Sequence, residues 1–463
     1  MSELVIELPG FAGTIFRPGD PDYDEARTVF NAMVDRRPAL IARCTCTADV
    51  SAAVRFARAN NLEISVYGGG HSVTGAAVVD GGMCVDLRGL KTIAIDAQKR
   101  VARAGGGMTW GEFDAATQEH GLAVTGGRVP STGIGGLALG SGSGWLERAL
   151  GFTCDNLLEA EIVTATGDVV TASAADNPDL FWAIRGGGGN FGIVTHFTLR
   201  LHPVGPLLWG GMLIFPGPRG AEVLKAYRDF VAKAPDEVGS GLAFLTAPPE
   251  EFVPEPARGH PCIGVICAYL GDPADGPAAY APLLELAPAV AMVDVMPYVV
   301  IQSLIAPGNP KGRFNYWTAD FYDDLSDEAV DVLAGIAGQP SSPFNQIIVV
   351  PGGGAIARID DEATAFGSRQ AAFNIHYLGM WEGQADSQRH IDYIKHLAGA
   401  MKPWSTGAVY LNFLGDEGPS RVEAGFGPAK FARMQQIKAQ WDPENVFHIN
   451  QNIPPAPSVP PQR

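Results

Sequence analysis

Two glycine-rich loops restrict the possible folds of this chain more than any other feature. The first is Gly68-Gly69-Gly70, directly after a predicted strand at residues 62–67, and the second spans residues 126–145 (GGRVPSTGIGGLALGSGSGW). Without Cβ atoms, the backbone N–H groups of such loops can approach an anion closely and form a concave nest around it. Either loop alone could be a tight turn, but together they favour a site for one extended cofactor that carries a diphosphate.

The first loop differs from the G-x-G-x-x-G fingerprint of dinucleotide-binding folds, because that motif opens directly into a helix. Here the chain continues into β-like segments at residues 76–87, 91–96 and 100–104. A helix is expected only from Thr109, where the sequence Thr-Trp-Gly-Glu forms a capping box with Glu112. The nucleotide-binding unit predicted here is therefore rich in strands.

The order of predicted elements divides the chain into four regions. Residues 1–205 begin with a strand–helix–strand crossover and continue mainly as strands. Residues 206–405 alternate amphipathic helices with strands, which indicates a second, α+β unit. Residues 406–453 add a predicted strand and a helix, and residues 454–463 (PPAPSVPPQR) form a proline-rich tail.

Charge and cysteine usage exclude several classes of partner. The net charge of -17 disfavours nucleic acid and anionic membrane surfaces, and no stretch approaches membrane-spanning length. The six cysteines lack CxxC spacing and neighbouring histidines, so no metal site is expected. The first residues do not resemble a signal peptide, and free thiols suit a cytoplasmic protein.

Several motifs carry a family resemblance. VYGGGHS at 66–72, the second glycine loop and DLFWAIRGGGGNFGIVT at 179–195 resemble the vanillyl-alcohol-oxidase type of FAD-binding fold. YLNFLGDEG at 410–418 and WDPENVFHINQNI at 441–453 resemble the carboxyl-terminal segment of berberine bridge enzymes. Within that family the chain resembles the bacterial 6-hydroxy-D-nicotine oxidases, through stretches such as RPALIARC and NNLEISV.

The resemblance implies a two-domain α+β architecture, with an FAD-binding domain of the VAO/PCMH type and a substrate domain built on an antiparallel sheet. Residues 1–205 would form most of the FAD domain and residues 206–405 the substrate domain. Residues 406–453 would return to the FAD domain as a berberine-bridge-like segment.

The resemblance also implies a covalent flavin. The family bonds a histidine directly after the glycines to FAD, and the matching residue is His71. Many relatives add a cysteine link in the second loop, but this chain has Val129 there, so we expect a single link. The other residues expected to contact FAD are Gly68, Gly69, Gly70, Ser72, Gly126, Ser131, Thr132, Gly133, Gly136, Gly140, Ile193, Val194, Asn450 and Asn452.

Tyr410 is the leading candidate for the catalytic base. If residues 408–414 form a strand, the two-residue period directs Tyr410 and Asn412 to one face. Several members of the resembled family place a base-acting tyrosine at this position. A tyrosine pKa is normally about 10, so without stabilisation of its phenolate Tyr410 would orient the substrate or pack as a structural residue.

The remaining candidates lie in two predicted strands. In FNIHYLGMW, Asn374 and His376 share one face, and His376 is an alternative base unless it is a structural histidine. Tyr316 and Trp317 are aromatic walls for a flat substrate in one interpretation and core residues in the other.

The sequence therefore predicts an FAD-dependent oxidoreductase. It would remove a hydride from an alcohol, amine or sugar-type carbon of a small molecule, and oxygen is the expected electron acceptor. A nicotinamide-dependent flavin reductase and a flavin-binding protein without turnover are the alternatives. The reductase would need a second nucleotide site, which the sequence does not indicate.

Overall fold

The predicted crossover unit is present near the amino terminus. The computed structural model describes residues 8–251 and 253–457. The first sheet contains β1 (Thr14–Phe16), β2 (Leu40–Arg43), β3 (Ile64–Tyr67) and β4 (Met83–Asp86), and α2 (Thr47–Ala59) connects β2 to β3. β4 lies between β2 and β3 and is parallel to both, so their carboxyl ends meet at one edge. The first glycine loop leaves this edge, directly after β3.

A second, antiparallel sheet completes the amino-terminal half. Its strands in spatial order are β5 (Ile93–Asp96), β6 (Val101–Gly105), β10 (Ile193–Arg200), β8 (Leu157–Val163) and β9 (Val169–Ser173). The associated helices are α3 (Trp110–Gln118), α4 (Ile134–Leu139), α5 (Glu147–Leu150) and α6 (Pro178–Ala183). The capping box predicted at Thr109 and Glu112 is confirmed at the start of α3. Of the β-like segment predicted at 76–87, only β4 is a strand.

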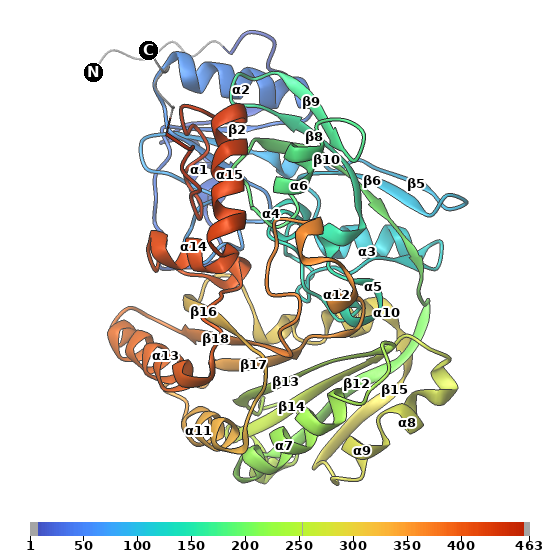
Figure 1. The fold of residues 1–463 in the computed structure, drawn as a ribbon. Coiled ribbons are helices and arrows are strands. Elements are labelled where there is room, and N and C mark those ends of the chain that lie inside the picture. The colour runs from blue at the N-terminus through green and yellow to red at the C-terminus, as the bar shows by residue number, and fades with distance from the viewer. Residues whose placement is uncertain (1–7, 252, 458–463) are drawn as a thin grey trace.

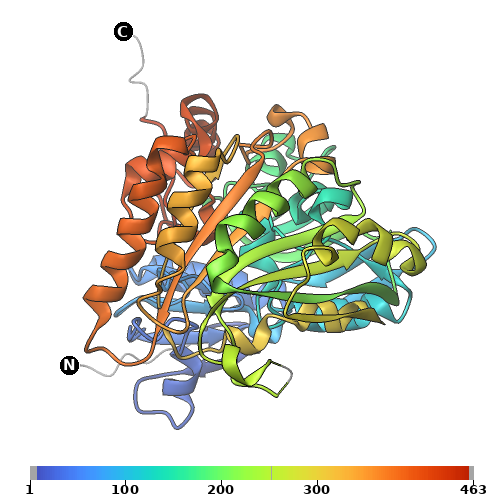
Figure 2. The ribbon, with the colours of Figure 1, turned by 90° about the horizontal axis from the view of Figure 1, so that it is seen from below.

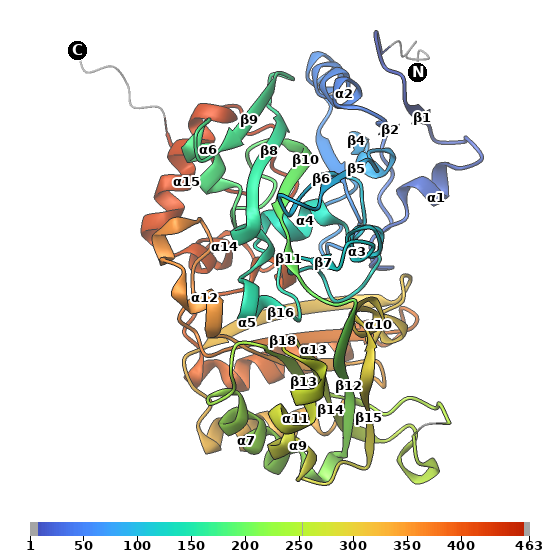
Figure 3. The same ribbon diagram turned by 90° about the vertical axis from the view of Figure 1, so that its right-hand side faces the viewer.

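The second half is built on a seven-stranded antiparallel sheet. In spatial order its strands are β15 (Val290–Pro297), β12 (Leu207–Pro216), β14 (Pro261–Tyr269), β13 (Val238–Thr246), β17 (Gln346–Pro351), β18 (Phe373–Trp381) and β16 (Phe314–Tyr322). Helices α7 (Gly220–Val231), α11 (Asp327–Ala337) and α13 (Ser387–Met401) cover its outer face (Figure 2). The opposite face is directed toward the amino-terminal half (Figure 3).

The carboxyl-terminal segment packs against the amino-terminal half. Helices α14 (Pro419–Phe426) and α15 (Pro428–Trp441) lie beside it (Figure 1), and α15 contacts α6. Val409, Met434 and Ile453 share one apolar core with residues of the second sheet. Residues from three parts of the chain that are distant in sequence line one cavity, which is described in the next subsection.

The predicted α+β architecture, with an antiparallel sheet in the second half of the chain, is confirmed. The domain boundaries at residues 205, 405 and 453 stay predictions. Residues 1–7, from which we expect no signal peptide, lie outside the described residues. Residues 458–463, the last six of the predicted tail, also lie outside them. Within residues 8–251 and 253–457, no helix combines the length and apolar character needed to cross a bilayer.

Candidate active site

The two glycine-rich loops touch each other. A Cβ atom on Gly69 would lie 2.2 Å from the backbone nitrogen of Gly133, and one on Gly133 would lie 2.3 Å from the nitrogen of Gly69. Gly70 has φ of +70°, a left-handed conformation that favours glycine. Only residues without side chains allow this close approach, which brings both predicted nests to one place.

This contact predicts the effect of Gly69→Ala. The added methyl group meets backbone atoms that cannot rotate away, and such overpacking costs about 1–3 kcal/mol. We expect a lower Tm and a lower content of the expected flavin, measured by thermal unfolding and visible absorbance. Gly335→Ala in α11 is the control, because no atom lies within 4 Å of the added carbon. Unchanged Tm and flavin content in Gly69→Ala would show that the loops do not depend on this contact.

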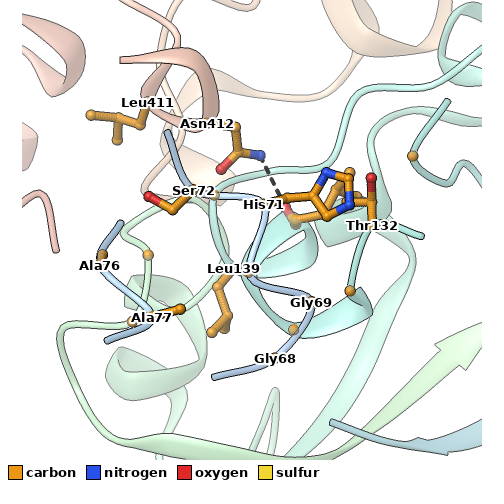
Figure 4. Close-up of a pocket in the computed structure, with 18 of the residues that line it drawn as sticks. Gly68, Gly69, His71, Ser72, Ala76, Ala77, Thr132, Leu139, Leu411 and Asn412 are labelled. Atoms are coloured by element: carbon orange, nitrogen blue, oxygen red, sulfur yellow. Dashed lines mark hydrogen bonds between the residues drawn. The ribbon is translucent and has the colours of Figure 1, made fainter. Parts of the chain in front are cut away.

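A cavity of about 320 Å³ opens where the loops meet, within the size range of small-molecule sites. It extends from the glycine loops to the inner face of the seven-stranded sheet. Figure 4 shows His71, Thr132 and Asn412 around the same space. The predicted residues that line it are Gly68, Gly69, Gly70, His71, Ser72, Thr132, Gly133, Gly136, Gly140, Ile193, Val194, Trp317, His376, Tyr410, Asn412 and Asn450.

Five predicted residues do not line the cavity. Tyr316 is on the opposite side of β16 from Trp317, because neighbouring strand residues alternate, and it packs against the helix-covered core. Asn374 is beside Phe321 in the strand register and lies beyond the cavity. Ser131 contacts His71 without lining the cavity. Gly126, which packs against Trp110, and Asn452 complete this group.

His71 is held as a neutral imidazole. Its ring stacks on Phe30 with centroids 4.5 Å apart, and its Nε2 lies 2.9 Å from Ser131 Oγ. Burial lowers the pKa of His71 to about 4, and the positive charge of Lys311 acts in the same direction. At neutral pH the imidazole therefore keeps a lone pair that can form a bond.

Tyr410 is almost fully buried, with 1% of its surface exposed. The prediction of a strand at 408–414 is wrong: only Val409 forms an isolated bridge, to Asp320, and a 3₁₀ turn covers Leu411–Phe413. The two polar side chains still meet, because this turn brings Asn412 Nδ2 to 3.3 Å from the Tyr410 hydroxyl. Their shared face therefore results from the turn and not from strand alternation.

His376 lies in the sheet wall of the cavity, between Ala319 and Ile348 in the strand register. Its ring stacks on Phe413 at 4.0 Å and on Tyr410 at 5.7 Å. Burial holds the pKa of His376 well below its ordinary value, and the charge of Arg128 adds to this effect. The side chain is therefore neutral at physiological pH.

Several lining residues were missed by the sequence analysis. Phe30 and Gln346 lie in no recognisable motif, whereas Phe413 lies within the 410–418 motif that was recognised. Residues 187–190 also line the cavity, and their signal was the run of four glycines before β10. The run lies within the motif at 179–195, but its glycines were not predicted to line the site.

Two segments of the chain match known protein families. Residues 38–173 match the FAD binding domain family, and residues 409–454 match the berberine and berberine like family. (R)-6-Hydroxynicotine oxidase of Paenarthrobacter nicotinovorans is 30% identical, over 98% of this chain and 99% of its own.

Solved structures show the same relationship. The crystal structure of 6-hydroxy-D-nicotine oxidase from Arthrobacter nicotinovorans has a TM-score of 0.88 and 28% identity, over 98% of this chain and 100% of its own. The berberine-bridge-enzyme-like protein 1 of Physcomitrella patens has a TM-score of 0.86 and 25% identity, over 97% and 98% of the two chains. The chain therefore belongs to the FAD-dependent oxidoreductases of the vanillyl-alcohol-oxidase and berberine-bridge-enzyme type.

Proposed function

We propose that this oxidoreductase removes a hydride from an alcohol, amine or sugar-type carbon of a small molecule, using FAD attached to His71, with oxygen as the electron acceptor. The observation that carries the proposal is the position of His71, a neutral imidazole in the wall of one cavity that also contains Tyr410 and the paired glycine loops. The (R)-6-hydroxynicotine oxidase relative supports an oxidase on a ring-containing amine as one possibility within this range.

The cavity lining suits FAD in charge and shape. Although the chain carries a net charge of -17, the described lining residues include Arg128 and two histidines but neither Asp nor Glu. This lining avoids repulsion of a diphosphate, which the side-chain-free N–H groups of the two glycine loops would hold. Asn450 Oδ1 is buried and has no hydrogen-bond partner among the described residues, so it is available to the flavin ring or ribityl chain.

His71 would hold the flavin through one covalent bond. Bond formation needs the unprotonated nitrogen that the lowered pKa provides, and the 2.9 Å contact between Nε2 and Ser131 Oγ orients the ring. Val129 also lines the cavity but has no nucleophilic atom. A single link is therefore proposed.

The protein groups have a limited task in the reaction. FAD, when bound, supplies the acceptor for the substrate hydride. Tyr410 would accept the proton from the substrate O–H or N–H, and His376 is the alternative because it is neutral and lies in the same cavity. Trp317 and Phe413, stacked with centroids 5.4 Å apart, form an aromatic wall suited to a flat or ring-shaped substrate.

A substrate panel tests the proposal. Alcohols, cyclic amines, sugars and a reduced nicotinamide nucleotide are each mixed with the protein under nitrogen, and loss of flavin absorbance is recorded; peroxide is then measured in air. We expect at least one class to bleach the flavin and to release peroxide. Bleaching without peroxide would exclude the oxidase assignment and leave a dehydrogenase. Bleaching only by a nicotinamide would favour a flavin reductase, and no bleaching by any class would contradict turnover.

A further inference from the structure

The Tyr410 hydroxyl oxygen has three polar neighbours. The backbone N–H of Ser143 lies at 3.0 Å, Ser141 Oγ at 3.2 Å and Asn412 Nδ2 at 3.3 Å. Two of these groups, the backbone N–H and the amide N–H, can only donate hydrogen bonds. The hydroxyl of Ser141 donates to the Tyr410 oxygen in this geometry.

The orientation of the Asn412 amide is fixed by its surroundings. Asn412 Nδ2 also lies 3.2 Å from the carbonyl oxygen of Leu137, which can only accept. The nitrogen must therefore face both Leu137 and Tyr410. The amide oxygen occupies the space over Gly140, where a Cβ atom would lie 1.9 Å from it. A glycine is required at position 140 for this arrangement.

The three neighbours suit an ionised tyrosine better than a neutral one. A neutral phenol has one proton and two lone pairs, and the two obligate donors occupy both lone pairs. Because the Ser141 hydroxyl also donates, the phenol proton has no acceptor among these three neighbours and must be directed into the cavity. A phenolate can accept from all three groups at once, so each of them donates and none is left without a partner.

Ser141 is itself held in an unusual conformation. Its φ is +115°, which side chains rarely adopt, and it is fully buried. Such strain costs about 1–3 kcal/mol and persists at functional sites. A glycine would adopt this φ without strain, and glycines occupy the positions on both sides of Ser141. A glycine here would lack the hydroxyl that contacts Tyr410.

We propose that Ser141 is a positioning residue which, with the Ser143 N–H and the Asn412 amide, forms a three-donor cradle for the phenolate of Tyr410. The inference rests on the proposed function in one respect, the role of Tyr410 as base. It identifies the groups that offset the cost of burying the Tyr410 phenolate.

The surroundings of Tyr410 on balance oppose its ionisation. Burial is the largest influence and raises the pKa of Tyr410, and the Glu147 carboxylate raises it further. Arg128 lies 3.2 Å from Glu147 and offsets part of its charge. His376, stacked on Tyr410, is neutral. The three hydrogen bonds are thus the influence that lowers the pKa.

The test measures ionisation without any substrate. The flavin-loaded protein is labelled with carbon-13 at the tyrosine Cζ, and the Tyr410 resonance is assigned by its absence in Tyr410→Phe. We expect Tyr410 to ionise at a lower pH than Tyr227, which is also fully buried but whose hydroxyl contacts one polar group, Ser240 Oγ; Tyr227 is assigned by its absence in Tyr227→Phe. In Ser141→Gly the fold is retained and the ionisation moves upward by about one to two pH units, because one donor to a charged group is lost.

Ser51→Ala is the matched control, since Ser51 is a buried serine on α2, away from the cavity. Its Tyr410 titration should match that of the wild-type protein. A Tyr410 that ionises at no lower pH than Tyr227 in the wild type, or the same Tyr410 titration in Ser141→Gly and wild type, would overturn the cradle. Neither result depends on turnover, so a failure of the base role, seen in the Tyr410→Phe rate, is distinguished from a failure of the cradle.

Discussion

Replacing Tyr410 by Phe is expected to slow flavin reduction by about 10²–10⁴-fold, the usual contribution of general-base assistance. The substitution removes one hydroxyl and nearly preserves the volume of the side chain. The flavin should stay bound with the same absorbance spectrum. Rapid mixing with an accepted substrate under nitrogen measures the effect, because reoxidation is excluded there.

The same substitution also leaves two donors without their acceptor, the Ser143 N–H and the Asn412 amide. A buried group left unpaired costs about 1–3 kcal/mol, so some loss of stability is expected alongside the loss of rate. Tyr227→Phe is the matched control: Tyr227 is fully buried in the helix-covered core and its hydroxyl lies 2.9 Å from Ser240 Oγ. It should lose stability but keep the reduction rate.

The size of the effect separates the possible roles of Tyr410. An orienting hydroxyl would cost on the order of tenfold, as the loss of one ordinary hydrogen bond does. An unchanged rate would remove Tyr410 from the mechanism. His376, which faces the same cavity, would then be the first candidate.

Replacing His71 by Ala is expected to abolish acid-stable flavin. The glycine loops remain, so FAD can still bind reversibly, but no nucleophile is left at that position. After precipitation with acid, all flavin of His71→Ala should appear in the supernatant, whereas the wild-type pellet stays yellow. His202→Ala is the control, because His202 is a partly buried histidine that forms a hydrogen bond with Asn156. Burial lowers the pKa of His202 as well. Acid-stable flavin in His71→Ala would place the link elsewhere.

The elements with strong local signals could be predicted from the sequence. The strand at Phe373–Trp381 has the bounds that its apolar run indicates, and the capping box at Thr109 starts a helix as its spacing requires. The sequence predicts no helix directly after Gly68–Gly70, unlike a G-x-G-x-x-G fold, and the structure has none there. In each case residues close in sequence determine the structure.

Other features depend on contacts between distant residues. Alternating polarity at 408–414 indicated a strand, but these residues pair with another strand only at Val409 and then turn. Tyr316 and Trp317 are adjacent and similar, and only the packing of helices on one face of the sheet decides which one reaches the cavity. Phe30 stacks on His71 from 41 positions away, a contact that no local pattern encodes.

Peptide mapping of the flavin-loaded protein shows which residue carries the flavin. Trypsin cleaves after Arg58 and Arg88 and after Arg128 and Arg148, so His71 and Val129 fall in separate peptides, residues 59–88 and 129–148. We expect peptide 59–88 to carry the additional mass of FAD, with fragment ions assigning it to His71, and peptide 129–148 to be unmodified. Release of all flavin by acid from a fully loaded sample, with both peptides at their unmodified mass, would contradict the attachment of FAD to His71.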